Sequence, residues 1–274
     1  MAVSQADKSR AFVALHERHG AFVIANPFDA GSARMLAHVG FEALATSSGA
    51  NAAALGRRDG RVSRAEALAH ARLIVEATDL PVSADLEKGF GDRPEDAATT
   101  IREAIGVGLV GGSIEDATGD PANPRYDPAL ATARVTAAVA AARAAPFRFM
   151  LTARCENFIR GNPDLDDTIR RLQAYEKAGA DALMAPGLPD VASVARVCAS
   201  LQKPFNFMAG IKGKSFSVAE LAGAGVKRIS LATSLYRAAM TAAVEAAREV
   251  EEAGTFGYIE RSLATPEMNA FLEG

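Results

Sequence analysis

The sequence predicts a protein of the α/β class, a (β/α)8 TIM barrel with an additional helical segment at its C-terminus. Eight short apolar runs alternate with helical patterns along the chain, and their continuous apolar character is typical of parallel strands buried on both faces. The expected strands cover residues 22–25, 43–46, 82–85, 112–115, 149–153, 182–184, 205–207 and 228–231. Repeated strand–helix units in this number and order favour a barrel, with a doubly wound open sheet as the alternative.

Helix signals occupy the segments between the expected strands. Ser63 and Glu66 have the spacing of a capping box ahead of an apolar helical face. Asp127 and Pro128 suit the N-cap and first position of a helix that runs to about Arg143. Four glycines each follow a helical pattern directly before an expected strand, where a left-handed residue ends a helix. These glycines are Gly40, Gly108, Gly179 and Gly225.

The composition predicts one domain over residues 1–274, with residues 256–274 as a C-terminal extension that packs on a neighbouring subunit. A net charge of −3 without a basic stripe argues against a nucleic-acid or anionic-membrane partner. No apolar run approaches membrane-spanning length, and residues 1–10 are polar. Two cysteines cannot form a disulfide framework, so the expected location is the cytoplasm.

Carboxylates gather after the second, third and fourth expected strands, where a barrel places its active site. They are Asp59, Asp85, Glu87 and Glu115, and Arg154 ends the fifth strand. Converging carboxylates raise one another's pKa unless a cation lies among them. Oxygen ligands without His or Cys select Mg²⁺ or Mn²⁺. The alternative for Asp59, Glu87 or Glu115 taken singly is a solvated loop charge or a helix cap.

A family resemblance becomes specific at residues 85–91, which read Asp-Leu-Glu-Lys-Gly-Phe-Gly. This segment resembles the Asp-x-Asp-x-Gly-Tyr-Gly signature of the isocitrate lyase/phosphoenolpyruvate mutase superfamily, with Glu87 in place of Asp and Phe90 in place of Tyr. Further segments resemble other motifs of that superfamily in the same order, and together they cover nearly the whole chain. These segments are residues 25–33, 46–49, 114–116 and 152–154.

The resemblance implies a metal site and a role for each of its residues. Asp85 would bind Mg²⁺, or Mn²⁺, directly. Asp59, Glu87 and Glu115 would hold the waters that the metal ion keeps.

The resemblance also implies how a small carboxylate substrate is bound. Backbone groups at Ser47, Gly49 and Ala50 would bind its carboxylate. Arg154 would bind its oxygens from the other side, since the guanidinium fork suits a carboxylate or an enolate. The alternative for Arg154 is an ion pair with Glu115 or Glu156, and both interpretations can hold together. Asn206, in the seventh expected strand, is a further candidate for substrate binding.

The activity that the resemblance implies is carbon–carbon cleavage of a small α-keto or α-hydroxy (di)carboxylate. The metal acts as a Lewis acid and stabilises the enolate left when the bond from C3 to the departing group breaks. Asp85, Glu115 and Arg154 would carry this chemistry. A homotetramer or homodimer is also implied.

The loop at residues 117–126 indicates which reaction of the superfamily the protein catalyses. It contains no Cys and no His, whereas the isocitrate and methylisocitrate lyases carry a Cys-Gly-His motif there. It also lacks the Lys that the mutases carry in this loop. Oxaloacetate-type decarboxylation is therefore favoured, because CO₂ leaves without a protein acid. The alternatives are a phosphonate-type P–C bond enzyme, a methylisocitrate/dimethylmalate-type lyase, and a non-catalytic metabolite-binding barrel. Tyr126 is a candidate proton donor on this loop, although packing is the more common role of a loop tyrosine.

Overall fold

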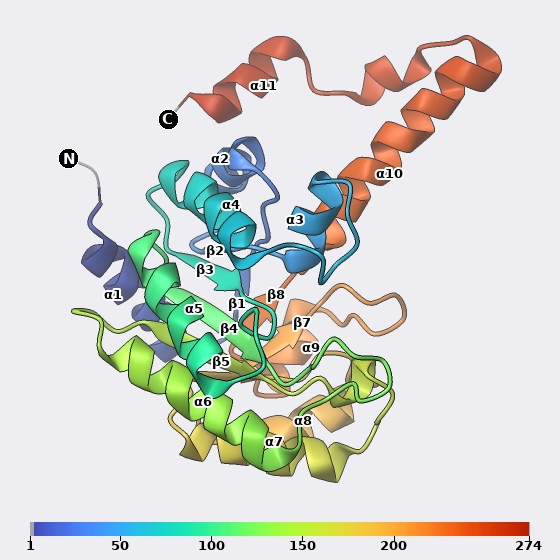
Figure 1. The fold of residues 1–274 in the computed structure, drawn as a ribbon. Coiled ribbons are helices and arrows are strands. Elements are labelled where there is room, and N and C mark those ends of the chain that lie inside the picture. The colour runs from blue at the N-terminus through green and yellow to red at the C-terminus, as the bar shows by residue number, and fades with distance from the viewer. Residues whose placement is uncertain (1–2, 274) are drawn as a thin grey trace.

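The computed structural model describes residues 3–273, and its centre is a ring of eight parallel strands (Figure 1). The strands are β1 Phe22–Ile24, β2 Leu44–Ala45, β3 Val82–Asp85, β4 Gly111–Glu115, β5 Met150–Arg154, β6 Ala182–Met184, β7 Phe205–Met208 and β8 Arg228–Ser230. They are hydrogen-bonded in the order β1-β8-β7-β6-β5-β4-β3-β2, and a bridge between Ala25 and Leu44 joins the two ends. The predicted TIM barrel is confirmed, and the open-sheet alternative is wrong.

Each predicted strand is present, and every boundary lies within one residue of the prediction. The helices between and after them are α1 Gln5–Glu17, α2 Ala30–Val39, α3 Ser48–Ala54, α4 Arg64–Glu76, α5 Pro94–Gly106, α6 Pro128–Arg143, α7 Leu165–Lys177, α8 Val191–Ala199, α9 Val218–Gly223, α10 Ser234–Arg248 and α11 Thr265–Leu272. None of these helices is both long and apolar enough to span a bilayer.

Local sequence signals account for the helix boundaries. Ser63 and Glu66 form the predicted capping box at the start of α4. The Asp127 side chain accepts hydrogen bonds from two backbone N–H groups in the first turn of α6, which ends at Arg143 as predicted. The four predicted helix-ending glycines all have left-handed φ angles, between 91° and 105°. A side chain is strained at such angles, so glycine is favoured there.

The apolar core lies mainly between the strands and the surrounding helices. Buried residues such as Leu44, Ile74, Ile101 and Phe149 fill this layer. The alanines of α5 and α6 let these helices pack closely on the sheet. The fold is thus stabilised from outside the ring, which leaves the inner face of the barrel available for a polar cavity.

Helix α1 closes the end of the barrel opposite the carboxyl ends of the strands. Its residue His16 is buried and packs edge-on against the rings of Phe12 and Phe22. The ring nitrogen Nδ1 lies 2.8 Å from the carbonyl oxygen of Phe12, and Nε2 lies 3.3 Å from Nη1 of Arg228. Burial, together with the positive charge of Arg228, lowers the pKa of His16 to about 3. His16 is therefore neutral in the folded protein at ordinary pH.

Stability is expected to fall as the pH is lowered from about 6.5 towards 3. In this window the unfolded chain binds a proton on His16 that the folded protein does not bind, so each pH unit costs up to about 1.4 kcal/mol. Urea unfolding at pH 7 and pH 5 measures this loss. The variant His16→Gln should show a smaller pH dependence, whereas His19→Gln, at an exposed position, should retain it. An unchanged pH dependence in His16→Gln would contradict the assignment.

The C-terminal segment leaves the barrel wall, which confirms the predicted extra helices. Helix α10 projects away from the ring (Figure 1), and none of its residues is buried. Helix α11 then lies against α2, where the rings of His38 and Phe271 are 5.0 Å apart. Nη1 of Arg34 donates a 2.7 Å hydrogen bond to the carbonyl oxygen of Leu272. The end of the chain is thus fixed to the barrel, while α10 stands apart from it.

Candidate active site

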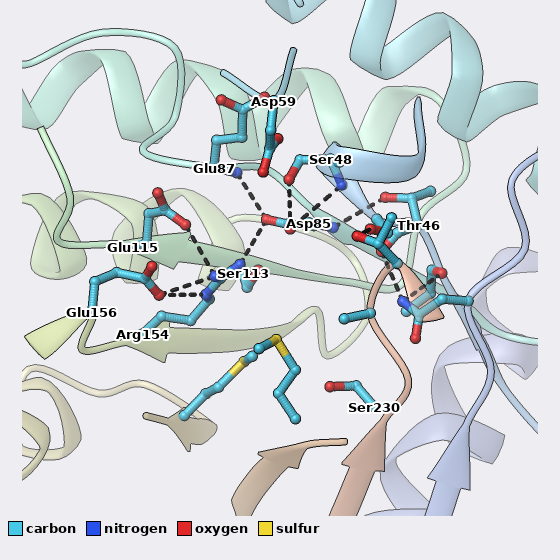
Figure 2. Close-up of a pocket in the computed structure, with 18 of the residues that line it drawn as sticks. Thr46, Ser48, Asp59, Asp85, Glu87, Ser113, Glu115, Arg154, Glu156 and Ser230 are labelled. Atoms are coloured by element: carbon cyan, nitrogen blue, oxygen red, sulfur yellow. Dashed lines mark hydrogen bonds and ion pairs between the residues drawn. The ribbon is translucent and has the colours of Figure 1, made fainter. Parts of the chain in front are cut away.

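The carboxyl ends of the strands surround a cavity of about 750 Å³. All but one of the site residues predicted from the sequence line it: Ser47, Gly49, Asp59, Asp85, Glu87, Glu115, Arg154 and Asn206. Figure 2 shows how the labelled carboxylates converge on Arg154 and Asp85. Ala50 differs, because it does not line the cavity and its backbone N–H, the group predicted to bind the carboxylate, donates to Oγ of Ser47 at 3.4 Å.

Arg154 lies at the centre of the site. Its Nη1 is 2.9 Å from Oδ1 of Asp85, and its Nη2 is 3.2 Å from Oε2 of Glu115. Nε and Nη2 also donate to Oε1 of Glu156, at 3.1 and 2.9 Å (Figure 2). Burial by itself would lower the pKa of Arg154, but these three carboxylates raise it well above the usual value. The guanidinium is therefore a fixed positive charge.

Asp85 is an ionised carboxylate despite its burial. Burial raises its pKa, but the charge of Arg154 and hydrogen bonds from the Glu87 and Ser48 N–H groups and the Ser48 hydroxyl produce a net lowering. The Ser48 hydroxyl donates to Oδ2 at 3.0 Å, and the Glu87 N–H donates to Oδ1 at 3.2 Å. Glu87 has a left-handed φ of 49°, and this strained turn directs its N–H at Asp85.

The negative charges of three other carboxyl groups are not fully balanced by neighbouring cations or hydrogen bonds. Burial and the charges of Asp85 and Asp59 raise the pKa of Glu87 to about 7. Burial and the charge of Glu156 raise the pKa of Glu115 well above its usual value. Glu156 is fully buried, and its Oε2 has no hydrogen-bond partner among residues 3–273. The rim thus carries an excess of negative charge that a cation would relieve.

This excess agrees with the predicted magnesium site. In the described part of the chain, no three Asp, Glu, His or Cys side chains are close enough to form a complete metal site by themselves. Mg²⁺ usually keeps several waters and takes only one or two carboxylates directly. The oxygen donors at the rim fit that ion, and the division between Asp85 as direct ligand and Asp59, Glu87 and Glu115 as water-holding groups stays a prediction.

The loop that begins α3 forms the opposite wall of the cavity. Ser47 caps the helix, and its hydroxyl lies 3.0 Å from the Thr233 hydroxyl, directly before α10. A Cβ atom added at Gly49 would lie 2.9 Å from Oγ1 of Thr233, so the close approach of the two segments requires glycine. Of the first N–H groups of α3, those of Ser48 and Ala50 donate to Asp85 and Ser47, so the Gly49 N–H is the one that remains suited to bind a carboxylate.

Sequence reasoning missed two residues of the site, Ser48 and Arg160. The alternative expected for Arg154, an ion pair with Glu115 or Glu156, is present with both carboxylates, at 3.2 and 2.9 Å. Ser48 binds Asp85, and Arg160 lies 3.8 Å from both Glu115 and Glu156.

Tyr126 does not line the cavity, so its assignment as a proton donor is not supported. Its hydroxyl donates a 2.6 Å hydrogen bond to Oδ1 of Asp92. The Arg134 guanidinium stacks over its ring, 4.4 Å from the centroid. Nη1 of Arg134 also donates to the carbonyl oxygen of Arg93, at 3.2 Å. Tyr126 and Arg134 together therefore hold the loop after β4 against the loop after β3.

Comparison with known proteins gives consistent matches. The phosphoenolpyruvate phosphomutase family model matches residues 12–251. Oxaloacetate decarboxylase 2 of Pseudomonas fluorescens is 30% identical over 89% of this chain and 83% of that protein. A solved structure from Burkholderia cenocepacia, provisionally named a lyase/mutase, is 49% identical with a TM-score of 0.96 and covers 98% of this chain and 97% of its own. The phosphoenolpyruvate phosphomutase structure from Streptomyces platensis is 26% identical, with a TM-score of 0.85 over 97% of this chain and 95% of that one.

The family match agrees with the site. The sequence motifs that resemble this superfamily lie at the ends of β1 to β5, and each contributes a side chain to one cavity. Because the family model covers most of the chain, the protein belongs to the phosphoenolpyruvate phosphomutase family, within the isocitrate lyase/phosphoenolpyruvate mutase superfamily.

Proposed function

We propose that the protein is a magnesium-dependent carbon–carbon lyase that acts on a small α-keto or α-hydroxy (di)carboxylate through an enolate, with oxaloacetate-type decarboxylation favoured. The observation that carries the proposal is the contact between the Arg154 guanidinium and Asp85 in a cavity rimmed by uncompensated carboxylates. Relatives named oxaloacetate decarboxylase and 2-methylisocitrate lyase support a reaction of this class.

The chain's own residues supply the binding and the charge. Asp85 would hold Mg²⁺, with Asp59, Glu87 and Glu115 around its waters, and the ion would supply Lewis acidity towards a keto oxygen. Nη1 of Arg154 keeps one N–H beyond its contact with Asp85, and Glu156 fixes the plane of the guanidinium, so this N–H is positioned to donate to a substrate oxygen. A donor that is held in place before the reaction stabilises developing negative charge.

Decarboxylation requires fewer catalytic groups than the other lyase reactions. When CO₂ leaves a β-keto acid, the electron pair of the broken bond passes to the keto oxygen, and no protein group has to protonate the leaving group. The loop at residues 117–126 has no Cys or His that could serve as an acid. Tyr126 in that loop is bonded to Asp92 and lies outside the cavity. The structure therefore supports decarboxylation over lyase reactions that require an acid from this loop.

The test is pyruvate release from oxaloacetate, methylisocitrate, dimethylmalate and phosphonopyruvate, each with Mg²⁺ and with EDTA. The expected result is enzyme-dependent pyruvate from oxaloacetate, well above the rate with free Mg²⁺, and its loss in EDTA. Pyruvate from phosphonopyruvate alone would favour the P–C bond alternative. No metal-dependent turnover of any of the four acids would contradict the proposal as stated.

We also infer that the protein is a homodimer or homotetramer. Apolar side chains on and after α10 are between 38% and 58% exposed, which is unusual for a surface that stays in water. They are Met240, Val244, Val250, Phe256, Ile259 and Leu263. Light scattering should give a mass of two or four times 28.6 kDa. A single-chain mass at micromolar concentration would contradict this inference.

A further inference from the structure

The inner face of the barrel below the active-site rim is polar. TIM barrels usually fill this space with branched apolar side chains. Here the residues two positions before Asp85, Glu115 and Arg154 carry hydroxyl groups. They are Ser83, Ser113 and Thr152. Because side chains two residues apart on a strand share a face, these hydroxyls form a layer directly beneath the site.

Arg228 lies at the floor of the same cavity and is 5% exposed. Its Nε donates to Oδ1 of Asn206 at 2.7 Å, and its Nη2 donates to Oγ1 of Thr152 at 2.7 Å. Its Nη1 lies 3.3 Å from the neutral His16 ring. All three partners are uncharged. Within residues 3–273, Arg228 takes part in no ion pair.

The charge of Arg228 is therefore not compensated by the protein. Burial lowers its pKa to about 10, so it still carries a full positive charge at neutral pH. The carboxylates at the rim do not serve as its partners, because Asp85, Glu115 and Glu156 pair with Arg154 instead. A buried charge without a partner is costly. A cavity that reaches this charge is consequently suited to admit an anion.

Hydroxyl groups line the same cavity as Arg228. Nδ2 of Asn206 donates to Oγ of Ser230 at 3.0 Å, so the Ser230 hydroxyl proton is free to point elsewhere. Ser230, Ser83 and Ser113 all line the cavity. An anion on the floor would thus meet the Arg228 guanidinium in a part of the cavity that also carries hydroxyl groups, while Asp85, Glu115 and Glu156 are paired with Arg154.

We propose that Arg228, with the hydroxyls of Ser83, Ser113 and Ser230, forms an anion subsite inside the barrel that takes a monoanion of carboxylate size. The anion has two sources with the same chemistry, a free small anion or the distal carboxylate of a substrate.

The distance between Arg154 and the subsite is short enough for one substrate to reach both. Arg228 contacts Thr152, which lies about 6–7 Å below Arg154 along β5. A four-carbon diacid spans its three carbon–carbon bonds of about 1.5 Å each plus its terminal oxygens. Only this second source rests on the proposed function.

Bromide is the probe for the subsite, used with metal-free protein in EDTA. The melting temperature is measured while bromide replaces a bulky sulfonate buffer anion at constant ionic strength. The wild-type melting temperature should rise and saturate with bromide, and Arg228→Gln should lose this rise. The variant Arg196→Gln removes one exposed surface arginine and should retain it. Bromide-soaked wild-type crystals should show an anomalous peak within hydrogen-bond distance of Arg228.

The two sources are distinguished by adding malate with Mg²⁺ to the soaked crystals, with oxalate as a diacid too short to reach the floor. Loss of the bromide peak with malate, but not with oxalate, assigns the subsite to a substrate carboxylate. A bromide peak that persists with malate assigns the subsite to a free anion.

Should Arg228→Gln fail to fold, the double variant Ser113→Ala, Ser230→Ala should weaken bromide binding several-fold. No bromide peak at Arg228, or a saturable rise that is equal in wild type and Arg228→Gln, overturns the proposal. Because the bromide measurements need no turnover, they stand even if the proposed reaction is wrong.

Discussion

Replacing Arg154 by alanine is expected to reduce kcat/KM by at least about 10³-fold. Loss of a single preorganised donor to an oxyanion typically costs 10² to 10³ in rate. Arg154 in addition balances the charges of Asp85, Glu115 and Glu156, so its loss leaves three buried carboxylates without their cation. The measurement is steady-state pyruvate release, with circular dichroism to establish that the variant is folded. We expect the fold to persist, because the cavity is open to water and the carboxyl groups can take up protons.

The variant Arg154→Lys separates charge from geometry. Lysine keeps the positive charge but lacks the planar fork that contacts two oxygens at once. We expect Arg154→Lys to recover only part of the activity lost in Arg154→Ala. If Arg154→Ala retained more than a tenth of wild-type activity, Arg154 would not be a catalytic residue. Full activity in Arg154→Lys would show that only the charge matters.

Replacing Asp85 by alanine is expected to abolish turnover at every Mg²⁺ concentration. Asp85 is the ionised carboxylate of the rim, since its pKa is held low by Arg154 and three hydrogen bonds. Two independent readouts are available, pyruvate release and the binding of Mn²⁺ followed by electron paramagnetic resonance. Both should be lost in Asp85→Ala.

A matched control is Asp166→Asn, which removes an exposed carboxylate on α7. It should leave Mn²⁺ binding and turnover unchanged. Retained turnover in Asp85→Ala would refute the metal assignment. Lost turnover with intact Mn²⁺ binding would instead place the metal on other rim carboxylates.

The sequence predicted the fold closely because its signals are local. The glycines at 40, 108, 179 and 225 and the short apolar runs each fix a boundary without help from distant residues. The rim residues were also predictable, because a barrel brings the carboxyl ends of its strands together whatever their separation in sequence. Asp85 and Arg154 meet in this way although 69 residues separate them.

The contacts within the cavity were less predictable because they depend on strand register and on loop conformation. Arg228 occurs at the start of β8 directly after Lys227, and only its register with Asn206 places it inside the barrel. Ala50 follows Ser47 and Gly49 in sequence, but its backbone N–H is taken up by the Ser47 side chain that caps α3. Tyr126 contacts Arg134 and Asp92, a partnership set by the packing of α6 against two loops.

The hydroxyl layer beneath the rim allows the depth of the cavity to change independently of the groups at its mouth. Ser83, Ser113 and Thr152 sit under Asp85, Glu115 and Arg154 on the same strands, yet they belong to neither the predicted metal site nor the loops. A larger side chain at Ser83 or Ser113 would raise the floor of the cavity and leave the groups at its mouth in place. The depth of the cavity can therefore change by single substitutions while the reacting end is conserved. Selectivity for chain length and the chemistry of bond cleavage are then separable traits, encoded in alternate residues of the same strands.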